Sequence, residues 1–273
     1  MSRVRTASIC LAIAFMASLA LARCHPFGDA GLYATKSANM PILNDAQPPP
    51  DVRAILPDVR AILIDKCADC HSNQTHVPLY GRFAPASWLM ERDIVAAREA
   101  MNLSHWDRYS PEQQQTFAAK IAQETKTHEM PLPQYRLIHW NARVSDTEIQ
   151  TLANWARATS DLDAAQPMPQ ASEGDPARGK TLFEKRCTGC HALTQNREGP
   201  RLQGVYGRTS GTAAGFAYSA ALKKAHIVWD DKSLEKWLTD PDTFIPGNDM
   251  DFLVSKPQDR QDIISYLRQS SGK

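Results

Sequence analysis

Apolar residues recur at helical spacing along most of the chain. A helix buries positions three and four apart on one face, whereas a half-buried strand alternates apolar and polar residues. No stretch of useful length shows that alternation, so the pattern predicts a mainly α-helical protein. The apolar stripes consist of Trp88, Leu89, Ile94 and Val95, of Ile149, Leu152 and Trp155, and, in a last helix from about residue 257 to 268, of Ile263, Ile264, Tyr266 and Leu267.

Three short polar motifs mark where helices should begin. Residues 110–113 (SPEQ) and 145–148 (SDTE) fit a capping box, in which a serine oxygen accepts an early backbone N–H and the fourth side chain reaches back. Asp175 followed by Pro176 fits a cap and a proline at the first helical position. The motifs place helix starts after Ser110, Ser145 and Asp175.

The first 22 residues have the pattern of an export signal. Arg3 and Arg5 precede an apolar run from Ala7 to Ala22, and the segment ends in the small-residue pattern that signal peptidase cleaves. An uncleaved membrane anchor is the rival interpretation, but the run of 16 residues is shorter than the roughly 20 that span a bilayer. We therefore predict a signal peptide at 1–22 and a periplasmic protein.

A lipid anchor at Cys24 is a further alternative. Residues 21–24 (LARC) resemble a bacterial lipobox, although Arg23 departs from the small residue usual before the cysteine. Lipidation at this position would tether the chain to a membrane through its N-terminus.

Changes in composition predict five segments. After the signal, residues 23–50 end in three prolines and read as a tether. A first domain then covers 51–161 and begins with the hexapeptide DVRAIL written twice, at 51–56 and 58–63. A linker rich in Pro, Ala and Gln at 162–174 leads into a second domain at 175–273.

Composition and charge narrow the class of protein. A chain of 273 residues with 42% hydrophobic and 22% charged residues has the size and composition of two globular domains. Its formal net charge is +1, and loss of residues 1–22 removes two arginines, which leaves −1. The mature chain therefore has no basic excess that would favour binding to nucleic acid.

The chemistry of the chain is concentrated in one motif that occurs twice. Residues 67–71 read CADCH and residues 187–191 read CTGCH. In C-x-x-C-H the two thiols bond the vinyl groups of one haem, and the histidine becomes an axial ligand of its iron. Two disulfides, or one zinc site of four thiolates, would explain the cysteines but not the histidine that follows each pair. The motifs predict two covalently bound haem c groups, held by Cys67 and Cys70 with His71, and by Cys187 and Cys190 with His191.

From Asp175 to Ser270 the chain resembles class I cytochrome c of the mitochondrial and c2-like type. The resemblance rests on GKTLFEKRCTGCH (179–191), EGPRLQGVYGRTSGTAAGFAYSAAL (198–222), LTDPDTFIPGNDMDF (238–252) and DIISYL (262–267). It implies that His191 is the proximal iron ligand and Met250 the distal one. It also implies a close crossing of the first and last helices at Gly179.

Further residue roles follow from the same resemblance. Pro200 is expected to accept a hydrogen bond from the proximal histidine through its carbonyl, and Arg208, Tyr218 and Trp229 are expected to bond a haem propionate. Asn248 matches a polar site beneath the methionine.

The chain departs from the mitochondrial pattern at the haem edge. Asp242, Asp249 and Asp251 stand where those proteins are rich in lysine. We expect weak, salt-sensitive docking with partners that are less uniformly acidic.

Residues 58 to about 158 resemble a family of bacterial haem-binding domains. The matching motifs are CADCHSN (67–73), APASW (84–88) and EMPLPQY (129–135). His71 is expected as the proximal ligand, and Met130 as the distal ligand because Pro131 and Pro133 stiffen its segment. The alternative distal ligands are His76, His105, His128 and His139.

Together these observations predict an all-α protein of two cytochrome c-like haem-binding domains that carries single electrons and has no catalytic residues. Its partners would be a dehydrogenase or quinol-oxidising complex on one side and a terminal reductase or oxidase on the other. The alternative is a peroxidase-like enzyme or a sensor of small ligands, with a reactive N-terminal haem and Glu129 as the candidate acid or base.

Overall fold

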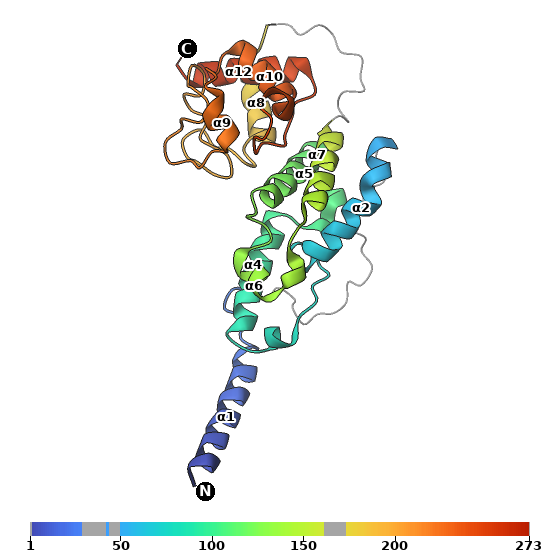
Figure 1. The fold of residues 1–273 in the computed structure, drawn as a ribbon, viewed down its shortest axis with the longest axis vertical. Helices are drawn as coiled ribbons and strands as arrows, with labels where there is room; N and C mark the ends of the chain where they lie inside the picture. The colour runs from blue at the N-terminus through green and yellow to red at the C-terminus, as the bar shows by residue number, and fades with distance from the viewer. Residues whose placement is uncertain (1, 29–41, 44–49, 161–172, 273) are drawn as a thin grey trace. The chain divides into compact units, whose positions relative to one another are not determined.

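The computed structural model describes residues 2–28, 42–43, 50–160 and 173–272, and its regular structure there is helical (Figure 1). Apart from one isolated antiparallel bridge between Thr209 and Val228, these residues form helices, turns and loops. The predicted all-α fold is confirmed. The predicted linker lies almost wholly outside the described residues.

Among the described residues, the N-terminal part contains seven α-helices, of which α3 lies within the first C-x-x-C-H motif. They are α1 (Ser2–Leu21), α2 (Pro50–Lys66), α3 (Ala68–His71), α4 (Ala86–Ala100), α5 (Pro111–Lys126), α6 (Pro133–Ile138) and α7 (Asp146–Ser160), with short 3-10 turns at Leu79–Arg82, Leu103–Arg108 and Trp140–Ala142. The C-terminal part contains α8 (Pro176–Arg186), α9 (Ala220–Ala225), α10 (Asp231–Thr239), α11 (Pro241–Phe244) and α12 (Pro257–Ser270).

Contacts divide the chain into two compact units. One contains Met1–Ala46 and Arg60–Arg108, and the other contains Gln47–Val59 and Tyr109–Lys273. Helices α5 and α7 pack against each other and belong to the second unit. The C-terminal helices therefore share their unit with α5, α6 and α7, which all precede the predicted linker.

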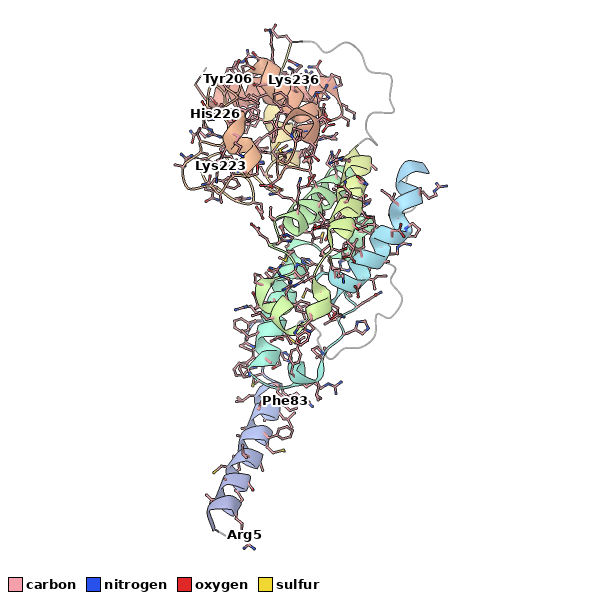
Figure 2. All side chains as sticks on the ribbon, viewed as in Figure 1. Arg5, Phe83, Tyr206, Lys223, His226 and Lys236 are labelled. Carbon is pink, nitrogen blue, oxygen red and sulfur yellow. The ribbon has the colours of Figure 1, made fainter. Side chains whose placement is uncertain are left out.

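In the first unit, α1 ends against the start of α4. The Ser18 hydroxyl donates to the carbonyl of Ala84 (2.7 Å), and the Trp88 indole donates to the carbonyl of Leu21 (3.1 Å). Phe15 of α1 packs on Phe83, which Figure 2 shows at this end of the helix. Much of α1 remains exposed and apolar, yet no helix in the described ranges has the length and hydrophobicity of a bilayer-spanning segment.

Two residues of the predicted tether are folded against the first unit. Ile42 and Leu43 are each only 2% exposed, and Arg60 donates hydrogen bonds to both of their carbonyls, at 3.0 Å and 3.1 Å. The N–H of Leu43 donates to the carbonyl of Leu103. Burial of such a side chain contributes roughly 1.5–3 kcal/mol. This part of residues 23–50 is therefore integrated into the fold.

The predicted caps start three helices. The Ser110 hydroxyl and Gln113 form a complete capping box on α5. Ser145 and Glu148 bond reciprocally ahead of α7. Asp175 accepts the first backbone N–H groups of α8. These side chains satisfy N–H groups that have no partner inside the helix, a contribution of about 1 kcal/mol each.

The C-terminal bundle is organised around the crossing of α8 and α12 (Figure 1). A Cβ atom added at Gly179 would lie 1.9 Å from the carbonyl oxygen of Asp262, so only glycine permits this approach. One turn further on, Phe183 packs on Tyr266 with ring centroids 5.4 Å apart. The crossing that the resemblance implied is present, and it supports a buried core whose members are Phe183, Val205, Trp229, Leu234, Trp237, Leu238, Ile245, Val254, Ile263, Ile264 and Leu267.

Candidate haem sites

The C-terminal motif follows α8 as one further turn of helix. The N–H of Cys187 donates to the carbonyl of Phe183, and the N–H of His191 donates to the carbonyl of Cys187 at 2.8 Å. The N–H of Gly199 in turn donates to the carbonyl of Cys190. These backbone bonds bring both thiols and the imidazole to the wall of one cavity.

That cavity has a volume of about 520 Å³ and is bounded mainly by apolar side chains. Ligand cavities of this size typically combine an apolar lining with a few placed polar groups. The residues present suit a haem, because thiols, an imidazole, a thioether and large apolar side chains converge here. Among the predicted site residues, the wall includes Cys187, Cys190, His191, Pro200, Arg208, Tyr218, Trp229 and Met250.

His191 is fixed by the backbone on two sides. Its Nδ1 lies 2.8 Å from the carbonyl oxygen of Pro200. A carbonyl can only accept a hydrogen bond, so Nδ1 carries the hydrogen and Nε2 keeps the lone pair that can bind a metal. A Cβ atom added at Gly199 would lie 2.2 Å from Cε1 of the ring. Burial lowers the pKa of His191, although the bond to Pro200 acts in the opposite direction. The imidazole is therefore held neutral in one tautomer, as an iron ligand requires.

The two cysteines of this motif are buried thiols. Burial raises the pKa of Cys187 to about 12 and that of Cys190 to about 11. Redox-active C-x-x-C pairs instead keep one cysteine with a lowered pKa. All six cysteines are free of disulfides, and the described part of the chain holds no group of three or more His, Cys, Asp or Glu side chains that could bind a metal ion. The disulfide and four-thiolate zinc alternatives find no support in this arrangement.

Met250 lies in the cavity wall on a loop between α11 and α12. Its backbone N–H donates to the side-chain oxygen of Asn248 at 2.7 Å. The amide nitrogen of Asn248 donates to the carbonyl of Ile245 (3.0 Å) and to Asp242 (3.1 Å). Asn248 is fully buried and is absent from the cavity lining, so it positions the methionine through the backbone.

The other predicted haem contacts line the cavity and already have protein partners. Arg208 donates to the carbonyl of Arg201 at 3.0 Å, and burial lowers the pKa of Arg208. The Tyr218 hydroxyl accepts from the N–H of Ala213 at 3.3 Å. Trp229 is 6% exposed and belongs to the core. Their contact with a haem propionate stays a prediction.

One wall of the cavity comes from α5, whose start the sequence predicted but whose place at this cavity no haem motif indicated. Thr116, Gln123 and Thr127 of α5 and its end lie among the lining residues, together with Glu129. Glu129, the candidate acid or base for the first haem, lies in the wall of the C-terminal cavity. No signal in the local sequence distinguishes these side chains from an ordinary solvated helix face.

The N-terminal motif repeats the same backbone turn. The N–H of Cys67 donates to the carbonyl of Leu63 in α2, and the N–H of His71 donates to the carbonyl of Cys67 at 2.9 Å. Burial raises the pKa of Cys70 to about 11. His71 Nδ1 lies 3.2 Å from the carbonyl oxygen of Met101, which takes the role that Pro200 has at the other site. Met101 could not be recognised from the sequence, because it acts through a backbone carbonyl and lies in none of the motifs matched in this domain.

Hydrogen bonds from polar side chains hold the loop after His71 in place. The side-chain nitrogen of Asn102 donates to the side-chain oxygen of Asn73 at 3.0 Å, and the backbone N–H of Asn73 donates to the Ser104 hydroxyl. Arg98 donates to the carbonyl of Ser72 at 2.8 Å. The two asparagines, Ser104 and Arg98 thus fix the segment that directly follows His71.

The alternative distal ligands of the first haem have other partners. His76 has a 91% exposed side chain beside Asp69, and the Nε2 of His105 lies 3.3 Å from the side-chain nitrogen of Asn73. His139 stacks on Tyr135, and its Nδ1 lies 3.1 Å from that residue's carbonyl oxygen.

The remaining candidates lie just after α5. His128 is exposed in a left-handed backbone conformation, with φ of 60°. Met130 is half-buried, and its N–H donates to the carbonyl of Glu124 at 3.1 Å. Ligation of the first haem by Met130 stays a prediction.

Comparison with known proteins gives two family matches. Residues 31–158 match the haem-binding domain family, and residues 176–271 match the cytochrome c family. The two matches together account for most of the chain.

Individual relatives are similar to the cytochrome c part. Cytochrome c of Euglena viridis is 51% identical over 98 residues, covering 35% of this chain and 96% of that protein. Cytochrome c of Chlamydomonas reinhardtii is 43% identical over 107 residues, covering 38% of this chain and 96% of that protein. The structure of cytochrome cH from Methylobacterium extorquens is 43% identical, covers 35% of this chain and 99% of its own, and superposes with a TM-score of 0.34.

Proposed function

The chain belongs to the cytochrome c family and carries a haem-binding domain ahead of its cytochrome c domain, and from this we propose that it is a periplasmic dihaem electron carrier. The cytochrome c domain implies haem-based electron transfer in general. The proposal adds that two haems are attached in one chain, that single electrons pass through both, and that no substrate is converted.

The observation that carries the proposal is the C-terminal cavity. Cys187, Cys190 and His191 come from one helical turn, while Met250 comes from the loop between α11 and α12. A bound haem supplies an iron that gains and loses one electron, and a His/Met ligand pair favours a relatively high reduction potential. An electron carrier needs this arrangement and no substrate pocket.

The protein's own residues would hold the group and set its environment. The Pro200 carbonyl keeps the proton of His191 on Nδ1 and raises the basicity of the opposite nitrogen. Asn248 accepts a hydrogen bond from the backbone N–H of Met250. The backbone that carries the thioether is therefore already held in place before the sulfur would bind iron. The apolar wall excludes water and lowers the local dielectric constant.

The first domain supports a second attachment site with the same backbone turn. His71 has a backbone carbonyl partner at Met101, in the same way that His191 has Pro200. Because a backbone carbonyl holds both histidines in the same tautomer, we propose His71 as the proximal ligand of the first haem. We propose Met130, on its proline-flanked segment, as the distal ligand.

Export and partners complete the proposal. The exposed apolar residues of α1 support its use as a signal peptide, with the mature protein in the periplasm and Cys24 as a site of lipid attachment if it is tethered. We propose a dehydrogenase or quinol-oxidising complex as electron donor and a terminal reductase or oxidase of a respiratory chain as acceptor.

The test is spectroscopic and uses exported protein from a haem-loading host. Low-temperature EPR with near-infrared MCD of the oxidised protein should show two six-coordinate haems, each with a His/Met signature. Reduced protein should bind CO slowly and should not consume peroxide. A haem that binds CO at once and turns over peroxide would contradict the proposal and favour the peroxidase-like alternative.

A further inference from the structure

One stripe of α5 faces the C-terminal cavity. Thr116, Lys120, Gln123 and Thr127 are spaced four, three and four residues apart, which places them on a single helix face. Thr116, Gln123 and Thr127 line the cavity, while Lys120 lies 2.6 Å from the carboxylate of Glu198. This face is polar, so the hydrophobic pattern alone would assign it to solvent.

The beginning of α5 contacts the C-terminal C-x-x-C-H turn and the loop after Met250. A Cβ atom added at Gly189, between the two haem-attaching cysteines, would lie 2.5 Å from Cγ2 of Thr116. The Gln115 amide donates to the carbonyl of Leu253, three residues after Met250, at 2.9 Å. The helix therefore touches the proximal motif and the distal loop together.

A charged pair joins the middle of α5 to the loop before Pro200. Lys120 lies 2.6 Å from the Glu198 carboxylate, and the Gln123 amide donates to the Glu198 carbonyl at 3.1 Å. Burial alone would lower the pKa of Lys120, but the bond and charge of Glu198 outweigh it and raise the pKa. Both side chains of the pair keep about a quarter of their surface exposed, so salt can screen the attraction.

Two cations at the end of this face pair with aspartates of the predicted haem edge. Lys126 of α5 lies 3.8 Å from Asp242 and 3.6 Å from Asp251, and Arg157 of α7 contacts both carboxylates. The Asp251 side chain is only 1% exposed. Two of the three aspartates at the haem edge are thus paired with cations of the same chain.

We infer that this face, formed by Gln115, Thr116, Lys120, Gln123 and Lys126 of α5 with Arg157 of α7, is a built-in docking partner for the edge of the C-terminal haem site. This α5–α7 face is joined to the cytochrome c domain through residues 161–172, so its contacts form at a high effective concentration. Each exposed ion pair contributes about fivefold or less to such an equilibrium, and docking is therefore reversible and salt-dependent.

Docking of this kind serves electron transfer between the two haem sites, a role that rests on the proposed function. The N–H groups of Glu129 and Met130 both donate to the carbonyl of Glu124 near the end of α5. One helix thus joins a wall of the C-terminal cavity to the segment that carries the predicted ligand of the first haem. While the face is docked, an external partner has to approach the C-terminal site from another direction.

The experiment is a charge swap in the full dihaem protein. Lys120→Glu and Glu198→Lys are made singly and together, with Lys224→Glu on the exposed surface of α9 as the matched control. Small-angle X-ray scattering across a range of ionic strength gives the maximum dimension. The intramolecular electron-transfer rate is measured after photochemical reduction of one haem.

We expect wild type and Lys224→Glu to be compact at low salt and extended at high salt. Each single variant should extend at low salt and transfer electrons about tenfold more slowly, since repulsion replaces attraction, and the double swap should restore both properties. Single variants as compact and as fast as wild type would overturn the inference, as would a double swap that restores neither property. Two haems in every variant would show that a negative result speaks against the docking inference and not against the proposed function.

Discussion

Replacing Gly199 with alanine would place a methyl group against the ring of His191. The added Cβ would lie 2.2, 2.5 and 2.7 Å from Cε1, Nδ1 and Nε2 of the ring. Carbon atoms in contact sit about 3.5 Å apart, so the ring must shift by roughly 1 Å. A shift of that size breaks the 2.8 Å bond between Nδ1 and the Pro200 carbonyl.

The lost hydrogen bond sets the size of the expected effect. Donation from Nδ1 makes the imidazole a more basic ligand, which favours oxidised iron, so its loss should raise the reduction potential. A bond of about 1 kcal/mol corresponds to roughly 40 mV for one electron.

Potentiometric titration followed in the haem absorption bands measures this shift for the C-terminal haem. Gly81→Ala is the control, because its Cβ would meet the flexible side chain of Met90. An unchanged or lowered potential in Gly199→Ala, with both haems attached, would refute the reasoning.

Three other changes test separate parts of the account. Met250→Ala should abolish the thioether-to-iron charge-transfer band of the C-terminal haem and let it bind CO rapidly in stopped flow; an intact band would exclude Met250 as ligand. Met130→Ala should remove one of two His/Met signatures in EPR and MCD, and an unchanged spectrum would discard Met130. Asp262→Asn should lower the free energy of unfolding by about 2 kcal/mol at neutral pH, because the buried carboxylate accepts bonds from Arg178 and from the N–H of Asp175. Burial would raise the pKa of Asp262, but these bonds lower it overall, so the contribution is present above about pH 4 and is lost as the pH falls through the folded-state pKa. Denaturant titrations at several pH values measure this difference, and a gap that persists at low pH would contradict the assignment.

The sequence predicted those features whose cause is local. A cap such as Ser110 acts within one turn, and C-x-x-C-H describes a single helical turn, so both can be recognised without the rest of the fold. The crossing at Gly179 and the Pro200 carbonyl were indicated by the resemblance, since the spacing of those motifs is specific.

Features that depend on contacts between residues far apart in the chain could not be predicted from the sequence. Gln115 meets Leu253 across 138 positions, and Thr116 meets Gly189, although both belong to a polar helix face. Met101 acts through its carbonyl, which every residue possesses. The resemblance placed Asp251 at the haem edge, but nothing in the sequence indicates that Lys126 lies opposite this carboxylate.

The most direct test of the central claim is the number of haems per chain. A pyridine haemochrome assay on exported protein, scaled to protein concentration by amino-acid analysis, should return two haem c groups per chain. Variants in which Cys67 and Cys70, or Cys187 and Cys190, are replaced by alanine should each return one. A value of one or none for the wild type would contradict the account.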